Sequence, residues 1–298
     1  MRELIVFGES IWDLFEDGRR CLGGSGLNLA WHLQGIGQSC HLISRVGRDE
    51  NGREILQRVQ DWGISTTHIQ IDEVHPTAYL EVILDEDGGH QYPSPPEHAL
   101  DFIEFQEDWL NFARTNLLYH GTYMLRQPTT RATIAKMKKA GFQMFLDLNL
   151  RENYWSHTLL DEWLFDIDYM KLSDHEFAMW HPDLDFLSLS AQIDWMQSFM
   201  RERNIAHILF TLGAKGSMVL TPDQFFKQEP TGKIEIHNTV GAGDAFCAGF
   251  IDGVLQGKDI DHCLLEATQL AEHICTVDSA TSPDRVFYED FRRHYLKG

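Results

Sequence analysis

Apolar and polar positions form two kinds of pattern, one typical of strands and one typical of helices, and these patterns alternate along the chain. Short apolar runs of strand length lie at residues 3–8, 40–47, 116–121, 142–150, 169–173 and 207–213. Between several of them, apolar side chains recur at helical spacing, at residues 26–37, 50–63, 130–141 and 189–204. Strands that alternate with helices over short connections are typical of βα units. The pattern therefore predicts an α/β fold with a mostly parallel sheet covered by helices on both faces.

One segment departs from this alternation. Residues 67–95, THIQIDEVHPTAYLEVILDEDGGHQYPSP, are rich in strand formers and contain no helical pattern. The alternating run AYLEVIL and the turn residues Asp87, Gly88 and Gly89 predict a hairpin or a small sheet that projects from the main body. Ligands of open α/β sheets bind beyond the carboxyl ends of the strands, so we interpret this segment as a lid that excludes water from a reaction there.

Composition narrows the classes of protein to which the chain can belong. Its 298 residues, 43% of them hydrophobic, are enough to bury one large core or two modest ones. Lys and Arg number 25 against 45 Asp and Glu, a net charge of 25 − 45 = −20, which argues against nucleic acid and anionic membrane as partners. The N-terminal apolar run is too short for a signal peptide, and no run reaches the roughly 20 apolar residues of a membrane span. We expect a soluble cytoplasmic protein.

Neither cysteine nor histidine forms a recognisable metal or disulfide pattern. The cysteines are odd in number and scattered, with no C-x-x-C pair, so we expect reduced thiols: Cys21, Cys40, Cys247, Cys263 and Cys275. The 15 histidines show no H-E-x-x-H spacing.

The stretch IHNTVGAGDAF, residues 236–246, carries the most chemistry. The alternating run KIEIHNT, residues 233–239, predicts a strand, Gly241-Ala242-Gly243 a turn, and the following apolar face a helix. Asp244 then falls in the first helical turn. Unpaired N–H groups and the positive end of the helix dipole favour bound phosphate and an ionised carboxylate at this position, although simple helix capping explains such a residue equally well.

Polar residues also follow three other predicted strands. Asp147, Asn149 and Arg151 are spaced by two, so they share one face if their strand continues through all three. The other two sets are Lys171, Ser173 and Glu176, and a tight turn formed by Thr211, Gly213 and Gly216, where backbone could approach a phosphate.

Near the N-terminus, a glycine-rich segment precedes a predicted helix. Gly23, Gly24 and Gly26 stand before it, Asn28 lies in its first turn, and Asp13 follows the first strand. The segment GGSGLNL lacks the third glycine of a dinucleotide fingerprint, and GAKGS lacks the spacing of a Walker loop. Nucleotide binding must therefore use another arrangement.

In order along the chain, these segments resemble the ribokinase-like sugar kinases of the PfkB family. The resemblance covers nearly the whole chain and rests on GGSGLNLAWHLQGIG, VGRDENG, DLNLRENYW and NTVGAGDAF. The last is similar to the C-terminal D-T-x-G-A-G-D signature and is the most specific. The resemblance implies a three-layer α/β sandwich. We expect one domain over residues 1–298, with a β lid formed from about 12–22 and 68–96, whose exposed sheet edge is a candidate homodimer surface.

The resemblance also implies phosphoryl transfer from ATP to a sugar hydroxyl. Asp244 would be the general base, and the amides of Ala242, Gly243 and Asp244 would hold the charge on the phosphoryl group; Gly241 begins the same catalytic turn. Glu176 would contact Mg²⁺ through water, and Ser173 stands where many relatives carry Asn. The implied ATP-binding residues are Lys171, Thr211, Gly213 and Gly216.

By the same resemblance, the acceptor is a neutral sugar, with fructose or a close ketose as our prediction. Asp13 would accept hydrogen bonds from sugar hydroxyls. Arg151 leaves open an acidic substrate such as 2-keto-3-deoxygluconate, and a nucleoside acceptor or a non-catalytic sugar-binding regulator on a kinase fold are further alternatives. The implied substrate-binding residues are Asp13, Gly23, Gly24, Asn28 and Arg151.

Two departures from the family pattern fall on one site. Asn238 stands where the signature usually begins with Asp, and Ser279 stands where Gly is usual. In many relatives that carboxylate helps to hold a monovalent cation. Asn keeps an oxygen ligand but removes a full negative charge, so we expect a weaker cation site.

Overall fold

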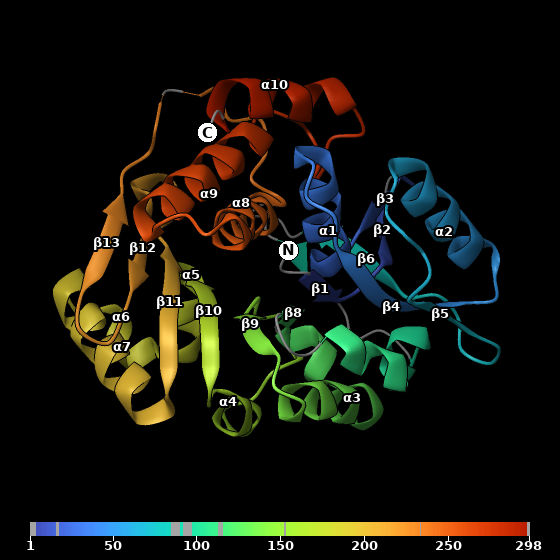
Figure 1. Cartoon of the computed structure of the whole chain (residues 1–298), viewed down its shortest axis with the longest axis horizontal. Helices are drawn as coiled ribbons and strands as arrows, with labels where there is room; N and C mark the ends of the chain where they lie inside the picture. The colour runs from blue at the N-terminus through green and yellow to red at the C-terminus, as the bar shows by residue number, and fades with distance from the viewer. Residues whose placement is uncertain are drawn as a thin grey trace.

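A nine-stranded sheet forms the centre of the molecule (Figure 1). The computed structural model describes residues 4–15, 18–84, 90–91, 97–112, 116–151, 153–232 and 234–296. The strand order is β13-β12-β11-β10-β9-β8-β1-β4-β5, parallel from β11 to β5, with β12 and β13 antiparallel at one edge. The strands are β1 Leu4–Phe7, β4 His41–Gly47, β5 Ile69–Asp72, β8 Leu117–Gly121, β9 Gln143–Asp147, β10 Ile167–Ser173, β11 Ile205–Thr211, β12 Ser217–Leu220 and β13 Phe225–Gln228.

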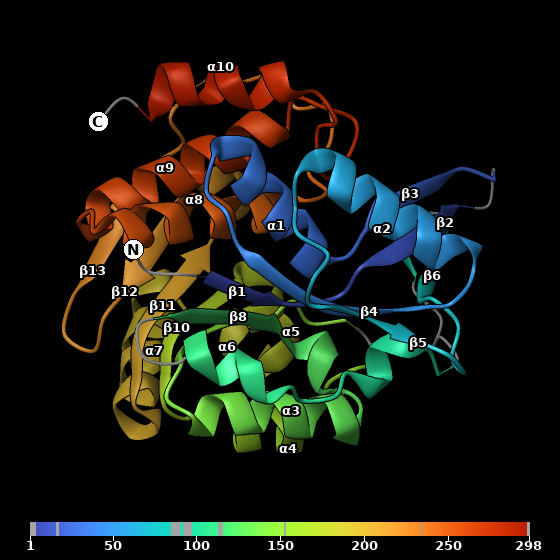
Figure 2. The same cartoon turned by 45° about the vertical axis from the view of Figure 1, so that its right-hand side comes forward.

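Helices cover both faces of this sheet, as Figures 1 and 2 show. One face carries α1 Ser25–Ile36, α2 Glu50–Trp62, α8 Ala242–Gln256, α9 Ile260–Ile274 and α10 Arg285–Tyr295. The other carries α3 Pro128–Lys139, α4 His157–Trp163, α5 Asp174–Trp180, α6 Pro182–Asp185 and α7 Leu189–Arg203. Short 3₁₀ turns are η1 Ala99–Phe102, η2 Glu107–Phe112, η3 Thr122–Leu125 and η4 Gly213–Lys215. The predicted three-layer α/β sandwich is confirmed.

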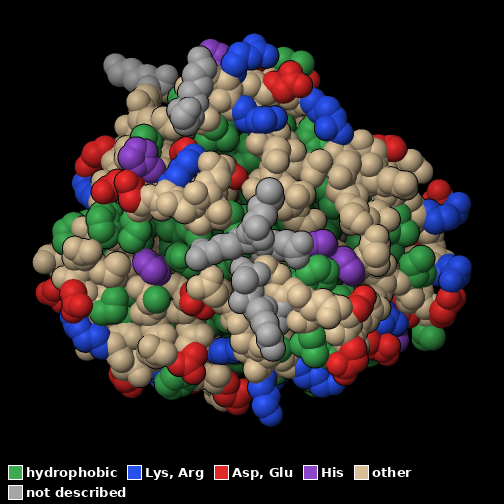
Figure 3. All heavy atoms as spheres, viewed as in Figure 1, with side chains coloured by type: hydrophobic (Ala, Val, Ile, Leu, Met, Phe, Trp, Pro, Cys, Tyr) green, Lys and Arg blue, Asp and Glu red, His purple; other side chains and the backbone are tan. Residues whose placement is uncertain are grey.

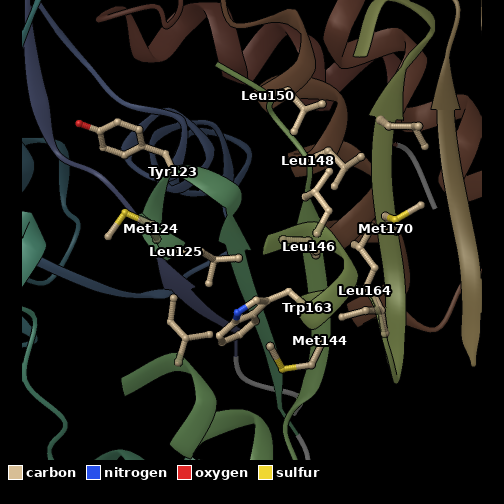
Figure 4. Packing of buried hydrophobic residues seen from close by; sticks show 14 of the residues in the cluster. Tyr123, Met124, Leu125, Met144, Leu146, Leu148, Leu150, Trp163, Leu164 and Met170 are labelled. Carbon is tan, nitrogen blue, oxygen red and sulfur yellow. The ribbon is translucent and has the colours of Figure 1, made fainter. Parts of the chain in front are cut away.

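Two hydrophobic cores fill the spaces between sheet and helices. Strand β1 serves both, because successive side chains point to opposite faces: Ile5 and Phe7 pack in one core, Leu4 and Val6 in the other. Figure 4 shows part of the first core, where Met144 and Leu146 of β9 pack beside Trp163 of α4. Because β1 is buried on both faces, it carries apolar side chains on both, which explains the continuous apolar run LIVF.

A second, four-stranded sheet lies beside the first. Its order is β3-β2-β6-β7, from β2 Ile11–Phe15, β3 Arg20–Gly23, β6 Tyr79–Leu84 and β7 His90–Gln91. The predicted antiparallel pairing of β6 with β7 is present, whereas the predicted turn at Asp87, Gly88 and Gly89 lies outside the described residues. Asp13 follows the first strand, as predicted, and lies within β2 of this second sheet.

Three strand predictions were wrong. Residues 69–72, assigned to the lid, form β5 at the edge of the main sheet, where they pair with β4. The strand expected over residues 142–150 ends at Asp147, and Asn149 takes a left-handed backbone with φ 35°. The alternating segment 234–239 forms no strand. Ile236 is 56% exposed, and the amides of His237 and Asn238 donate instead to the Cys275 carbonyl after α9. The alternating pattern did not produce a strand here, because these amides are paired with the segment after α9 rather than with a neighbouring strand.

Charged side chains of both signs are dispersed over the surface shown in Figure 3. The cysteines are all free thiols, as expected. Within the part of the chain that the structure describes, no helix is long and apolar enough to cross a membrane.

Strand β1 and helix α1 meet through two glycines. A β-carbon built on Gly8 would lie 2.5 Å from the Cα of Gly26, so neither position has room for a side chain. This contact brings the N-terminus of α1 directly against the carboxyl end of β1. The backbone approach therefore fixes where the first turn of α1 lies relative to the sheet.

We expect Gly8→Ala to lower the free energy of unfolding by about 1–3 kcal/mol, because a methyl group would overlap packed backbone on both elements. Gly232→Ala is the matched control, since a β-carbon there has no neighbour within 4 Å. Denaturant unfolding of both variants measures the difference. Equal stability of the two variants would contradict the assigned constraint.

Candidate active site

A small cavity lies beyond the carboxyl ends of β1 and β9, between the first turns of α1 and α8. Its volume is about 90 Å³. Its lining comes from segments far apart in the sequence: Glu9, Ile11, Asp13, Gly24, Ser25, Asn28, Leu80, Tyr123, Asn149, Arg151, Tyr154, Val240, Gly241, Asp244 and Ala280. The structure thus brings together six residues with a predicted role in the site: Asp13, Gly24, Asn28, Arg151, Gly241 and Asp244.

Asp244 is the most strongly held carboxylate of the cavity. It lies in the first turn of α8, as predicted, and is 8% exposed. The Ser25 hydroxyl donates to Oδ1 at 2.6 Å, and the Asn28 amide donates to Oδ2 at 2.9 Å. Burial raises the pKa of Asp244, and these two hydrogen bonds act in the opposite direction. The carboxylate is therefore fixed in orientation by two donors from the first turn of α1.

Two glycines before α1 make room for acidic neighbours. A β-carbon on Gly23 would overlap the Oδ2 atom of Asp13, and one on Gly24 would lie 2.5 Å from the Glu9 carbonyl. Gly24 also has φ 101°, a conformation that side chains strongly disfavour. Glycine is therefore required at both positions, because a side chain at either would overlap Asp13 or Glu9.

The cavity contains an excess of acid. Glu9, Asp13 and Asp244 contribute carboxylates, and Arg151 is the cation among the lining residues. Burial raises the pKa of Glu9, and raises that of Asp13 to about 6, while the positive charge of Arg151 acts in the opposite direction on both. The carboxyl of Asp13 is therefore the one whose raised pKa, about 6, lies close to neutral pH.

A second charged layer lies behind the glycine turn. Lys171 on β10 is buried, with its Nζ 3.1 Å from Asp147 Oδ1 and 3.6 Å from Glu176 Oε2. Burial alone would lower the pKa of Lys171, but the two carboxylates outweigh it and raise the pKa, so the amine stays charged. A β-carbon on Gly243 would lie 3.3 Å from this Nζ. The amine therefore supports the turn from beneath with a fixed positive charge.

Asp147, Asn149 and Arg151 do not share a face, contrary to the prediction. Asp147 is 1% exposed and belongs to the layer around Lys171, whereas Asn149 and Arg151 line the cavity. The left-handed backbone at Asn149 breaks the alternation that the prediction assumed.

The glycine turn itself differs in one detail from the expectation. Gly241 has φ 81° and caps α8, and its α-carbon lies against Ala280 of the segment after α9. The Ala242 amide donates to the Thr239 carbonyl at 3.2 Å, so it is not available as one of the predicted anion-binding groups. The amides of Gly243 and Asp244 belong to the first helical turn, whose N–H groups have no acceptor within the helix. Two of the amides therefore remain candidates.

The remaining predicted residues lie at the ends of β10 and β11. Ser173 and Glu176 form a capping box at the start of α5, and Ser173 pairs in register with Thr211. Gly213 and Gly216 take positive φ, and the Gly216 amide donates to the Gly213 carbonyl, so the predicted tight turn is present. This turn lies outside the lining of the small cavity, at the next strand ends along the sheet.

The hydrogen bonds of Glu176 decide which of its oxygens could contact a water bound to Mg²⁺. Its Oε2 accepts from the backbone and hydroxyl of Ser173, and its Oε1 accepts from the Leu150 amide at 3.1 Å. An oxygen that accepts one hydrogen bond keeps a second lone pair, so Oε1 fits one contact to a metal-bound water. Among the described residues, no three His, Cys, Asp or Glu side chains form a metal cluster. Glu176 therefore fits a contact to a metal-bound water rather than a direct bond to the ion.

The Asn238 side chain makes hydrogen bonds between two segments that a bound cation could otherwise connect. Its Nδ2 donates to the Asp278 carbonyl at 3.2 Å, and its Oδ1 accepts from the Val240 amide at 2.9 Å. The side-chain amide therefore adds to the backbone hydrogen bonds that link the segment before α8 to the segment after α9. Ser279 is turned to the Thr281 carbonyl, to which its hydroxyl donates at 2.6 Å.

Sequence reasoning missed several residues of the site. Ser25 and Glu9 contact Asp244 or its donors, and Tyr123 and Tyr154 form an aromatic wall with ring centroids 5.2 Å apart. Ser25 stands inside the glycine segment that had been recognised, so its position carried a signal. Tyr154 likewise stands inside a recognised segment, DLNLRENYW, whereas Tyr123 lies in the 3₁₀ turn after β8, where no motif marked it.

Comparison with known proteins gives a consistent result. The family model described as pfkB family carbohydrate kinase matches residues 6–285. Fructokinase from Salmonella typhimurium is 26% identical over 291 residues, covering 93% of this chain and 92% of the relative. Aminoimidazole riboside kinase from Salmonella typhimurium strain LT2 is 25% identical, covering 95% and 90%, and 5-dehydro-2-deoxygluconokinase 2 from Bacillus cereus strain ZK is 25% identical, covering 82% and 76%.

A solved structure agrees with these relatives. The crystal structure of fructokinase from Vibrio cholerae O395 in fructose, ADP and calcium ion bound form has a TM-score of 0.78 and 25% identity, covering 98% of this chain and 99% of that one.

We expect turnover to depend little on potassium, because the Asn238 amide already joins the segments that a cation would bridge. Asn238→Asp should create or strengthen a dependence, since it removes this donor and adds a negative charge. The measurement is kcat/KM of both proteins with potassium replaced by a large organic cation at constant ionic strength. Strong potassium activation of the unmodified protein would show that this interpretation of Asn238 is wrong.

Proposed function

The chain belongs to the pfkB family of carbohydrate kinases and is an ATP-dependent carbohydrate kinase, and from this premise we propose that it phosphorylates a hydroxyl of fructose or a close ketose. One observation carries the proposal. A buried carboxylate, Asp244, lies at a helix N-terminus beside the cavity and is oriented by Ser25 and Asn28. A group so placed can contact both an acceptor hydroxyl and an incoming phosphoryl group.

In the proposed reaction, Asp244 accepts the proton of the sugar hydroxyl as that oxygen attacks the γ-phosphoryl group. The amides of Gly243 and Asp244 and the positive end of the α8 dipole stabilise the charge on the phosphoryl oxygens. Lys171 adds a buried positive charge beneath the same turn. The base and the charge-stabilising groups thus occupy one turn of backbone, which keeps their geometry fixed during the reaction.

The nucleotide would lie along the ends of β10 and β11, with Thr211, Gly213 and Gly216 beside its phosphates and ribose. Mg²⁺ bound to the phosphates would neutralise part of their charge. Glu176 would orient one metal-bound water through Oε1, and Ser173 holds that carboxylate in place.

The charges of the cavity support a neutral polyol. Asp13 and Glu9 are good acceptors for sugar hydroxyls, and Arg151 can donate to a ring or carbonyl oxygen. An acidic acceptor would meet three carboxylates against one arginine, which is unfavourable in a buried site. This balance, together with the fructokinase relatives, favours a ketose over a sugar acid.

A nucleoside-like acceptor is the second candidate. Tyr123 and Tyr154 form an aromatic wall of the cavity, and a heterocyclic base could pack against it. One relative is an aminoimidazole riboside kinase. Initial rates with fructose, ribose, aminoimidazole riboside, adenosine, 2-keto-3-deoxygluconate and 5-dehydro-2-deoxygluconate would rank these acceptors. Preference for a sugar acid or a riboside by kcat/KM would overturn the ketose proposal.

Asp244→Asn should reduce kcat by at least about 10²-fold, because the base is lost while the helix amides are retained. ATP affinity should change little, and equilibrium titration with a fluorescent ATP analogue checks this. Near wild-type turnover of the variant would eliminate Asp244 as the base.

The KM for the sugar should rise as the pH falls through about 6, with little change in the KM for ATP. Burial raises the pKa of Asp13 to about 6, so this carboxyl is ionised above that pH and neutral below it, where its hydrogen bond to a hydroxyl is weaker. Asp13→Asn serves as the comparison, because its amide does not titrate. It should show a raised sugar KM at all pH values and lose this pH dependence. A dependence that persists in the variant would exclude Asp13 as its origin.

A further inference from the structure

A row of buried oxygens leads away from Asp244 into the protein. Asp244 Oδ1 is 2.6 Å from Ser25 Oγ, Ser25 Oγ is 3.0 Å from the Tyr119 hydroxyl, and Tyr119 is 3.3 Å from Asp147 Oδ2. Tyr119 lies on β8, is fully buried, and is not part of the cavity lining. A side chain behind the site is thus connected to Asp244 through a single hydroxyl.

The row has one hydroxyl hydrogen fewer than it has oxygen–oxygen contacts. There are three oxygen–oxygen contacts, whereas Ser25 and Tyr119 contribute one hydroxyl hydrogen each. Burial keeps the pKa of Tyr119 well above its ordinary value, so the phenol retains its proton. With both carboxylates ionised, Ser25 donates to Asp244, Tyr119 donates to Asp147, and the contact between the two hydroxyls has no hydrogen.

One added proton completes the row. If Asp244 becomes protonated on Oδ1, it donates to Ser25, Ser25 turns to donate to Tyr119, and Tyr119 keeps its bond to Asp147. No covalent bond changes in this rearrangement, which requires only the rotation of the serine hydroxyl. Burial raises the pKa of Asp147 to about 7, and the charge of Lys171, whose Nζ lies 3.1 Å from Oδ1, acts in the opposite direction. Above that pH Asp147 is ionised, and the rearrangement leaves its ion pair with Lys171 in place.

We propose that Ser25 and Tyr119 form a hydrogen-bond switch that stabilises Asp244 in both its ionised and its protonated state. This inference rests on the proposed role of Asp244 as the base. The proton that leaves the acceptor hydroxyl breaks one O–H bond there and forms one on Asp244, and that proton supplies the hydrogen missing from the row. Tyr119 acts through Ser25 and is therefore a positioning residue rather than a catalytic one.

The two members of the switch should shift the pKa of Asp244 in opposite directions. Tyr119→Phe removes the acceptor that Ser25 needs when Asp244 is protonated, which disfavours the protonated state and lowers the pKa. Ser25→Ala removes a donor to the ionised carboxylate. Because hydrogen bonds to a charged group are the stronger ones, this change raises the pKa.

Tyr169→Phe is the matched control. Tyr119 and Tyr169 are both in register with Phe145 of β9, so they occupy the same row of the sheet on either side of it. Removal of the Tyr169 hydroxyl makes the same chemical change outside the row of oxygens. The other ionisable groups that face Asp244 or Asp147 stay in place in all three variants: Glu9, Asp13, Arg151, Lys171, Glu176 and Cys247.

The first test is a carboxyl titration that requires no activity. Proteins labelled with ¹³C at the aspartate carboxyl carbon are titrated by NMR, and Asp244→Asn assigns the resonance. The switch predicts a lower pKa of Asp244 in Tyr119→Phe, a higher one in Ser25→Ala and no change in Tyr169→Phe. Shifts of the same sign in the first two variants, or none in Tyr119→Phe, would overturn it. If Tyr119→Phe folds poorly, 3-fluorotyrosine at position 119, a weaker acceptor, should lower the pKa in the same direction.

The second test is kinetic. Tyr119→Phe should lower kcat roughly two- to tenfold, the effect of about one hydrogen bond, and leave the sugar KM unchanged. The acid limb of its pH profile should move to lower pH. Altered KM with unaltered kcat would indicate a packing role and contradict the switch. A failure of the proposed function is distinct from either result, since then Asp244→Asn would retain turnover or no sugar would be phosphorylated.

Discussion

The structure depends on the meeting of two helix N-termini, those of α1 and α8, beyond the carboxyl end of β1. Gly8 and Gly26 let α1 approach β1 until their backbones touch, and this places Ser25 and Asn28 against the first turn of α8. A buried aspartate at such a point needs donors, because an ionised carboxylate without them is costly. The hydrogen bonds from Ser25 and Asn28 offset the cost of burying the Asp244 carboxylate and also fix its orientation.

Charge is arranged in two layers around this point. The outer layer faces the cavity and contains Glu9, Asp13 and Arg151, whereas the inner layer contains Lys171 with Asp147 and Glu176. In the inner layer, the single amine of Lys171 contacts both carboxylates and lies close to the backbone of the glycine turn. In the outer layer, the carboxylates line the cavity, so their hydrogen-bonding capacity faces a ligand. This division separates groups that support the site from groups that can recognise a substrate.

Backbone links between distant segments complete the site. The segment after α9 contacts Gly241 through Ala280 and is joined to the segment before α8 by the Asn238 side chain. The indole of Trp31 on α1 donates to the Ser282 carbonyl of the same segment. The glycine turn is therefore held by α1, by the C-terminal part of the chain and by Lys171, all at once.

The sequence by itself determined the α/β class, the positions of α1, α2, α3, α7 and α8 and of most strands of the main sheet, the helical turn that contains Asp244 and the family resemblance. These follow from local periodicity and short motifs, which depend on near neighbours in the chain. Only the tertiary structure decided that β9 ends at Asp147, that residues 234–239 form no strand, and that residues 69–72 join the main sheet. Only it brought Glu9, Ser25 and Tyr119 to Asp244. Strand pairing and buried hydrogen bonds join residues separated by many tens of positions, so no local pattern encodes them.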